Sequence, residues 1–224
     1  MAVLLNIDTA TPMGSICLSK DGDQLILLEN NEQKDHASWL HPAIDRALKA
    51  LGYGLKDIQA VSVTAGPGSY TGLRVAMATA KGFCYALQIP FIAVSTLKLM
   101  AFAAQAQWKD QVEGLGPMID ARRTEVFTAI FDQDLNQIKP EIALVLEEDA
   151  FKEELAKYKI VFFGSGSKKW QDICRSHNAF FADVSWDAGH LGILAEKKFN
   201  LQEFSDISQS EPAYLKGFYT HAKK

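Results

Sequence analysis

The sequence predicts an α/β fold of two related lobes, each built from a β-meander and helices. Three observations support this fold class. Apolar strand-like runs alternate with helix-like segments in the first half, a glycine-rich turn at 66–72 joins a strand to a helix, and the order of the first segments returns after residue 117. Such alternation is typical of α/β domains.

The chain opens with a predicted meander of three strands. The apolar run Val3–Ile7 is a buried strand that ends at Asp8. The runs Ser15–Ser19 and Gln24–Glu29 follow, joined by an acidic turn, and extended apolar runs around such turns are typical of antiparallel strands.

A helix is predicted over His36–Leu51, because apolar residues recur at helical spacing and Gly52 then stops it. The stripe is broad for a single buried face. It packs either on the sheet of its own lobe, as an amphipathic helix does by default, or partly on another protein. Its members are Trp39, Leu40, Ala43, Ile44, Ala47, Leu48 and Leu51.

A strand at Ala60–Thr64, a glycine loop and a helix over Leu73–Leu87 come next, with Thr71 as the expected helix cap. Glycines and a proline in the loop fix a sharp turn. Its outward N–H groups could hold an anion, or the glycines could let another backbone approach closely, and the loop alone leaves both interpretations open. The spacing excludes the phosphate loop of common NTPases and the serine-hydrolase elbow.

The second half repeats this layout after a strand at Ile89–Val94, a helix at Thr96–Gln107 and a polar linker at 108–116. Residues 117–132 match 5–21 in order, each with a strand ending in Ile-Asp. A further strand at Lys159–Phe163 leads into a second glycine loop and a helix from Lys168. We therefore expect a duplication, with an N-terminal lobe at 1–107 and a smaller C-terminal lobe at 108–224.

Composition limits the function. The 224 residues are 48% hydrophobic, enough for a substantial core, and the net charge of −4 argues against independent, tight nucleic-acid binding. Cys17, Cys84 and Cys174 lack metal or disulfide spacing. With no signal-like start and no run of about 20 apolar residues, we expect a cytoplasmic protein without a membrane segment.

Several segments together resemble the TsaB family, bacterial proteins needed to make N6-threonylcarbamoyladenosine at position 37 of tRNAs. The resemblance runs the length of the chain, and the glycine block is its most specific part. The matching segments are Ile7–Thr11, Gly66–Arg74, Ala78–Gly82, Ile89–Pro90, Val94–Leu97, Ile119–Arg123 and Pro212–Lys216.

The resemblance implies the two-lobed fold of actin, Hsp70 and sugar kinases, known as the ASKHA fold. It also implies a non-catalytic sister of TsaD, the transferase subunit. TsaD members carry a His-x-x-x-His metal pair where this chain has Thr96 and Met100, which are poor ligands for a catalytic metal. His36 and His41 point about 140° apart on a helix and do not replace the pair.

We therefore expect no catalytic residue, no metal and no cofactor, with weak ATP or ADP binding only in a complex. Vestiges of phosphate loops are expected at Asp8, Thr9, Gly66, Gly68, Gly164 and Gly166. For Asp8 and Asp120, which end equivalent strands, we favour a structural role over holding magnesium.

The expected partner is TsaD, with the ATPase TsaE and tRNA reached through the complex, and a homodimer forms when TsaD is absent. The expected interface lies on the two helices of the first lobe, at Trp39, Leu40, Ala43, Ile44, Ala47, Arg74, Ala76, Met77, Ala80, Lys81 and Cys84. Small residues on the second helix would let another helix approach. The alternatives are that both helices only cover their own sheet, that the chain is an autonomous ATP-dependent kinase or metallopeptidase, or that it is a self-associating structural protein.

Overall fold

The computed structural model describes residues 2–30 and 35–216 and divides the chain into two compact units. The first comprises Met1–Ala104 and Val184–Pro212, and the second comprises Gln105–Asp183 and Ala213–Lys224. The expected lobes, 1–107 and 108–224, therefore need one correction. A stretch near the C-terminus returns to the first unit, because its helix covers a face of the first sheet that would otherwise be exposed.

The first unit contains a five-stranded mixed sheet in the order β3-β2-β1-β4-β5. The first three strands form the expected antiparallel meander, and β4 and β5 continue the sheet in parallel with β1. The strands are β1 (Val3–Asp8), β2 (Gly14–Lys20), β3 (Asp23–Asn30), β4 (Ala60–Thr64) and β5 (Phe91–Val94).

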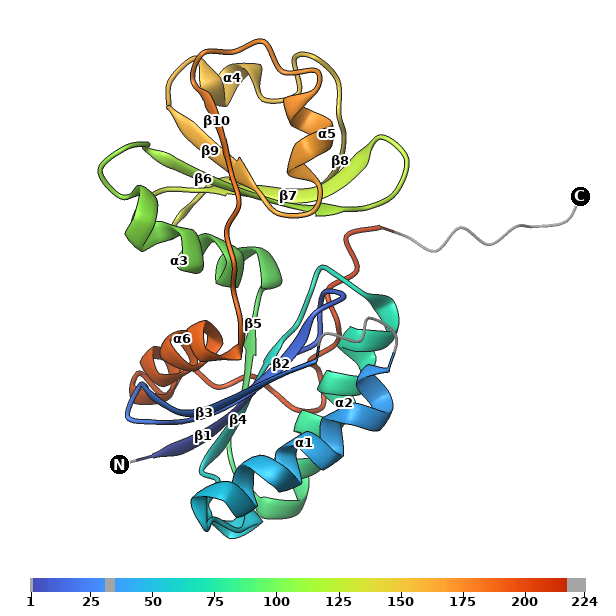
Figure 1. The fold of residues 1–224 in the computed structure, drawn as a ribbon, viewed down its shortest axis with the longest axis vertical. Helices are drawn as coiled ribbons and strands as arrows, with labels where there is room; N and C mark the ends of the chain where they lie inside the picture. The colour runs from blue at the N-terminus through green and yellow to red at the C-terminus, as the bar shows by residue number, and fades with distance from the viewer. Residues whose placement is uncertain (1, 31–34, 217–224) are drawn as a thin grey trace, which may run out of the picture. The chain divides into compact units, whose positions relative to one another are not determined.

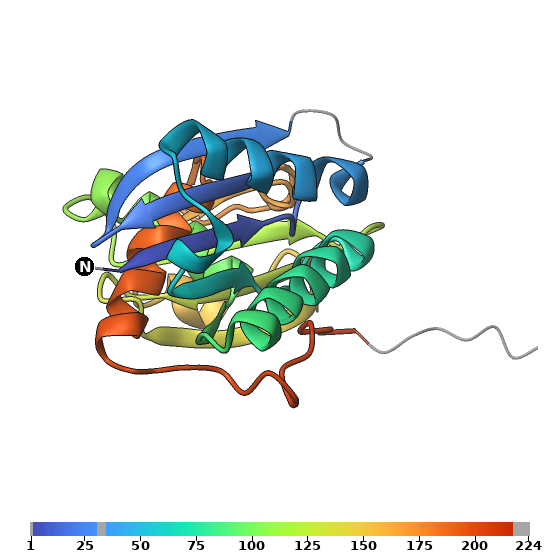
Figure 2. The same ribbon diagram turned by 90° about the horizontal axis from the view of Figure 1, so that it is seen from below.

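Helices cover both faces of this sheet (Figure 1). Two helices, α1 (His36–Leu51) and α2 (Tyr70–Leu87), lie side by side on one face, as Figure 2 also shows. The opposite face is covered by α6 (Ala188–Asn200), where the lack of a side chain at Gly192 lets the helix pack against Asn6. A short 3-10 helix spans Leu55–Asp57, and α3 (Thr96–Trp108) carries the chain from the first unit into the second.

The second unit repeats the topology of the first. Its sheet has the order β10-β9-β6-β7-β8, again with an antiparallel meander followed by two parallel strands. Taken from its other edge, this order is β8-β7-β6-β9-β10, which corresponds strand for strand to β3-β2-β1-β4-β5 and confirms the predicted duplication. The elements are β6 (Gly114–Asp120), β7 (Glu125–Phe131), β8 (Gln137–Val145), α4 (Lys152–Leu155), β9 (Ile160–Phe163), α5 (Ser167–Gln171) and β10 (Ala179–Ala182).

An aromatic cluster fills the core of this second unit. Phe151, Phe162 and Trp170 pack with ring centroids 5.0 to 6.2 Å apart and are almost wholly buried. Tilted and edge-on contacts of this kind stabilise aromatic cores beyond the area they bury. The small helices α4 and α5 are therefore held by Phe151, which precedes α4, and by Trp170 of α5, since four or five residues give little helical stability of their own.

The helix boundaries agree with the sequence at some ends and not at others. The bounds predicted for α1 are confirmed, with Asp35 as its cap and Gly52 in the left-handed conformation at its end. The cap expected at Thr71 is wrong, because α2 starts three residues earlier than predicted and Ser69 accepts the Gly72 N–H at 3.2 Å. The prediction omitted α6, β8, α4 and β10. Among the described residues no helix is long and apolar enough to cross a membrane.

The glycine loop packs directly against the turn that follows β1. A Cβ atom on Gly72 would lie 2.0 Å from the carbonyl oxygen of Thr9. The Thr9 hydroxyl donates to the Gly72 carbonyl at 2.8 Å, and the Ser69 N–H donates to the Ala10 carbonyl at 2.7 Å. Only glycine allows the two backbones to come this close.

We predict opposite effects from two glycine-to-alanine substitutions in the same helix. Gly72→Ala should destabilise the protein by about 2–3 kcal/mol, because its methyl group collides with backbone that has no room to move. Gly82→Ala should stabilise by about 0.5–1 kcal/mol, because its Cβ would meet nothing within 4 Å and alanine has the better helix propensity. Urea unfolding of both variants measures this, and equal effects would contradict the packing argument.

Candidate functional site

Asp8 lies buried at the end of β1, with its carboxylate held by its own unit. Its Oδ1 accepts the Thr64 hydroxyl at 2.8 Å and the Ala10 N–H at 3.1 Å, and the residue is only 2% exposed. Burial raises the pKa of Asp8 above its ordinary value and outweighs these two hydrogen bonds, which lower it. This environment disfavours the charged carboxylate that a hydrated magnesium ion requires.

Two N–H groups at the end of the first glycine loop are bonded inside the chain. The N–H groups of Ser69 and Gly72 are bonded to Ala10 and to the Ser69 hydroxyl, and the Gly66 carbonyl accepts from Thr96 at 2.8 Å. A Cβ on Gly68 would lie 2.2 Å from the Ala10 carbonyl oxygen. Of the two interpretations left open by the sequence, close backbone packing is the one that these contacts support.

The second glycine loop packs in the same way. The Gly166 N–H donates to the Met118 carbonyl at 3.0 Å, and both the N–H and the hydroxyl of Ser167 donate to the carbonyl of Gly164. A Cβ on Gly166 would lie 2.6 Å from Cγ1 of Val126. The loop therefore fastens α5 to the end of β6.

Asp120, the counterpart of Asp8 in the duplication, is exposed and paired. Its Oδ1 accepts Lys169 Nζ at 2.6 Å and the Arg122 N–H at 2.6 Å, and its own N–H donates to the Ser165 hydroxyl. Partial burial alone would raise the pKa of Asp120, but Lys169 and the Arg122 N–H outweigh it and hold this pKa below the ordinary value. The two equivalent aspartates thus have opposite pKa shifts.

The histidines do not gather into a metal site. His36 is buried, with Nε2 3.1 Å from the Thr11 carbonyl oxygen, so it is a packed residue of its own unit. His190 pairs with Asp187, which caps α6. Within the described ranges no group of three or more histidine, cysteine or acidic side chains is placed to hold a metal. His221 lies outside the described residues.

Thr96 and Met100, at the positions of the TsaD metal pair, are both fully buried on α3. The Thr96 hydroxyl has no hydrogen-bond partner among the described residues, and a thioether and a hydroxyl are weak ligands for a transition metal. The residues present therefore do not fit a catalytic metal ion.

Most of the side chains predicted to contact a partner face the interior of their own unit. Eight of the predicted side chains are at most 4% exposed, because they face the sheet of their own unit and form its core. They are Leu40, Ala43, Ile44, Ala47, Ala76, Met77, Ala80 and Cys84. An arginine at Ala80, for example, would disrupt the core and not a partner contact. Their burial confirms the alternative interpretation that these stripes cover the sheet.

The other three predicted interface residues lie nearer the surface. Trp39 is half-buried, and the Arg74 guanidinium lies 4.3 Å from the centroid of the Tyr70 ring. The Lys81 ammonium group donates to the Ser210 carbonyl, which ties α2 to the segment after α6. Of the three, only Arg74 is exposed.

The opposite sides of α1 and α2 form what we call the outer face. We define it by His41 and Asp45 of α1 and by Ala78, Gly82 and Tyr85 of α2, all exposed. Tyr85 is 75% exposed, more than any other large apolar side chain described. A hollow of about 380 Å³ lies along α1, lined by His41, Ile44, Asp45, Leu48 and Lys49 of that helix, by Tyr53, Gly54 and Leu55 after it, and by Phe83 of α2.

Sequence reasoning noted the small residues of the second helix but did not separate its two sides, and so placed the contact mainly on residues that face the sheet. The small residues on the other side are Ala78, Gly82 and Ala86, which are spaced at one helical turn and lie away from Ala76 and Ala80. Small exposed residues along one line of a helix leave space for a neighbouring helix.

Comparison with known proteins agrees with this architecture. A family model described as TsaD, tRNA N6-adenosine threonylcarbamoyltransferase, matches residues 30–186. The tRNA threonylcarbamoyladenosine biosynthesis protein TsaB of Escherichia coli K12 is 32% identical over 95% of this chain and 94% of its own length. The protein of the same name from Bacillus subtilis is 26% identical over 94% of this chain and 88% of its own.

Solved structures give the same result. YeaZ from Pseudomonas aeruginosa superposes with a TM-score of 0.80 at 27% identity, covering 96% of this chain and all of that one. A polyphosphate/ATP-glucomannokinase from Arthrobacter has a TM-score of 0.51 at 12% identity over 90% of this chain, which shows a likeness of fold alone. The two-lobed α/β fold of sugar kinases and actin is thereby confirmed. With identity to TsaB proteins along nearly its whole length, the chain belongs to the TsaB family.

Proposed function

We propose that this chain is a non-catalytic subunit in the formation of tRNA N6-threonylcarbamoyladenosine, and that it binds a TsaD-type transferase through the outer face of α1 and α2. The observation that carries the proposal is a contrast within one unit. Thr96, Met100 and Asp8, at the expected metal-pair and phosphate-loop positions, are buried, while the outer face of α1 and α2 exposes small residues and Tyr85.

The absence of a catalytic role is supported by the side chains at the metal-pair positions. Thr96 and Met100 cannot replace imidazole, and no other described residues supply a metal cluster. A metallopeptidase would need such ligands.

Nucleotide turnover by the chain alone is disfavoured by Asp8 and the glycine loops. Asp8 is buried with a raised pKa, and the N–H groups of Ser69, Gly72 and Gly166 that a phosphate would need are bonded within the chain. We therefore propose no resident cofactor, with ATP or ADP binding at most weakly and only in the complex.

The outer face has properties suited to a helix–helix contact. Ala78, Gly82 and Ala86 let a second helix approach the α2 backbone closely, and Tyr85 offers a large apolar surface at low cost in side-chain entropy. Stable interfaces generally bury at least about 1,000 Å², which two helices of 16 and 18 residues can supply. The same face can pair with a second copy, so a homodimer should form without TsaD and compete with it. The TsaE ATPase and tRNA would join through the complex, in the cytoplasm.

We predict that Gly82→Arg weakens partner binding without harming the fold. The new side chain projects into open space in the isolated chain, but would occupy the position of the partner helix. Binding to purified TsaD, measured by calorimetry, should weaken at least about tenfold, equivalent to about 1.4 kcal/mol. Formation of the modified adenosine in a reconstituted reaction should fall in parallel.

Ile193→Arg is the matched control, because Ile193 is 40% exposed on α6, which covers the opposite face of the same sheet. It adds the same charge and should leave TsaD binding unchanged. Native binding by Gly82→Arg would overturn the proposed surface, and ATP turnover by the chain alone would overturn the non-catalytic role.

We also predict opposite stability changes for the two equivalent aspartates. Since the native pKa of Asp8 is raised, its ionisation costs stability as pH rises above about 3.9, the unfolded value, and Asp8→Asn should be more stable than the native chain at pH 7. Since the native pKa of Asp120 is lowered, its ionised form stabilises at pH 7, and Asp120→Asn should be less stable there.

Both differences should shrink as the pH falls through the carboxylate range. Urea midpoints at pH 7 and pH 4 test this, and Asp8→Asn should retain TsaD binding and adenosine modification. A loss of modification in a stable, TsaD-binding Asp8→Asn protein would show that Asp8 takes part in chemistry.

A further inference from the structure

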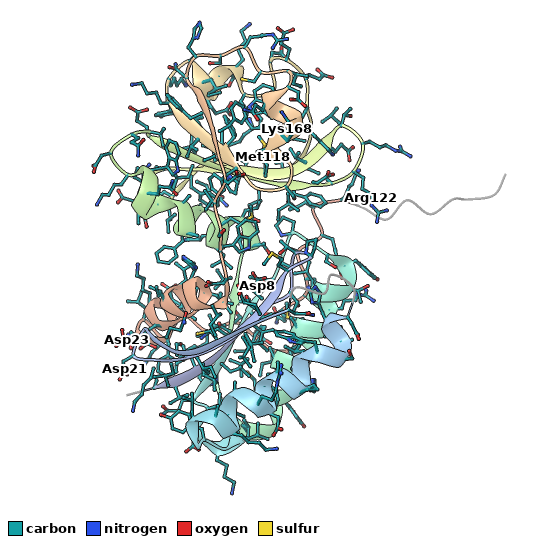
Figure 3. All side chains as sticks on the ribbon, viewed as in Figure 1. Asp8, Asp21, Asp23, Met118, Arg122 and Lys168 are labelled. Carbon is teal, nitrogen blue, oxygen red and sulfur yellow. The ribbon has the colours of Figure 1, made fainter. Side chains whose placement is uncertain are left out.

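The tip of the hairpin between β6 and β7 carries two consecutive arginines in an uncommon backbone conformation. Arg122 and Arg123 have φ angles of 71° and 52°, in the left-handed region that favours glycine. The turn is held by hydrogen bonds from the Arg122 N–H to Asp120 and from the Glu125 N–H to the Arg122 carbonyl. Figure 3 shows Arg122 at the end of this hairpin, outside the packed side chains of its unit.

The carboxylates beside the tip are each paired with a lysine. Lys169 binds Asp120 at 2.6 Å, and Lys216 binds Glu125. On α5 next to them, Lys168 binds Asp172 at 2.8 Å.

The guanidinium groups of Arg122 and Arg123 take no part in these pairs. Both residues are exposed, and neither guanidinium has a hydrogen-bond or ionic partner among the residues that the structure describes. The tip is therefore locally positive in a chain whose net charge is −4.

We propose that Arg122 and Arg123 bind the phosphate backbone of the tRNA substrate directly. The planar guanidinium group donates paired hydrogen bonds that match phosphate oxygens, and it stays charged at every physiological pH. The proposal rests on the proposed function for the identity of the RNA, but goes beyond the expectation that tRNA is reached only through the partner.

An RNA backbone suits the tip better than a protein surface. Residues 120–124 contain no large apolar side chain, whereas the core of a protein interface is mostly apolar. Phosphate contacts need only charge and hydrogen-bond donors, and they position a nucleic acid without reading its sequence. Lysine pairing of Asp120 and Glu125 also removes the repulsion that a polyanion would otherwise meet.

The test is tRNA binding by the double variant Arg122→Gly with Arg123→Gly. Glycine suits both φ angles, so the variant should be no less stable than the native chain in urea, which separates a binding defect from a folding defect. With an unmodified transcript of a tRNA that has adenosine at position 37, affinity is measured for the assembled complex with TsaD over a range of salt concentrations. We expect weaker binding, and a salt dependence whose slope is smaller by about 2.

Lys157→Ala with Lys159→Ala is the control, because both lysines are exposed and Ile160 beside them pairs with Gly114, at the opposite end of β6 from Asp120. This variant removes the same charge and should keep the native salt slope. An unchanged affinity and slope in the arginine variant would overturn the proposal, as would loss of TsaD binding with tRNA binding intact, which would assign the arginines to a partner carboxylate.

The same titration on the chain alone separates this proposal from the proposed function. If the native chain fails to bind TsaD, the proposed function fails. In that case the arginine proposal is tested on the chain alone. If the native chain binds the transcript, the arginine variant should bind it more weakly. If the native chain does not bind the transcript, the arginine proposal fails as well.

Discussion

The contact between the glycine loop and the turn after β1 is the constraint on which the first unit depends. Gly68 and Gly72 let the loop approach the carbonyl groups of Thr9 and Ala10 within distances that a side chain would forbid. This contact fixes where α2 begins and therefore which of its faces meets the sheet. It also engages the Ser69 N–H, which donates to the Ala10 carbonyl, so the same glycines that shape the loop make it a structural joint.

The duplication shows how one topology supports two different local environments. Strands β1 and β6 both end in Ile-Asp and pair with equivalent neighbours. Asp8 is buried, with hydrogen bonds from Thr64 and Ala10, and its pKa is raised, whereas Asp120 is exposed beside Lys169 and its pKa is lowered. The difference arises from the surroundings of each carboxylate: Asp8 is 2% exposed, whereas Asp120 is exposed and pairs with Lys169. Equivalent sequence positions therefore need not share a chemical role.

Much of the fold could be predicted from the sequence, because local signals fixed it. Helical spacing and Gly52 defined α1, and the repeated Ile-Asp strand end revealed the duplication. The return of α6 to the first unit could not be predicted, because its packing depends on contacts with residues such as Ser15, more than 170 positions earlier in the chain. The direction of the α1 and α2 faces was misjudged for a related reason. An apolar stripe indicates that a helix face is buried, but not whether the burying surface belongs to the same chain.

The small residues of α2 explain how one helix can serve two surfaces. Ala76, Ala80 and Cys84 follow one another at intervals of four and face the sheet. Ala78, Gly82 and Ala86 are also spaced at intervals of four, but each lies two residues after a member of the first set, and all three are exposed. Two residues turn a helix by about 200°, so the second line lies almost opposite the first. With small side chains on both sides, α2 separates its own sheet from anything docked outside by little more than the width of its backbone. Rigid packing on the inner side holds the outer side in place, and an exposed helix held in this way loses little further entropy when another helix docks on it.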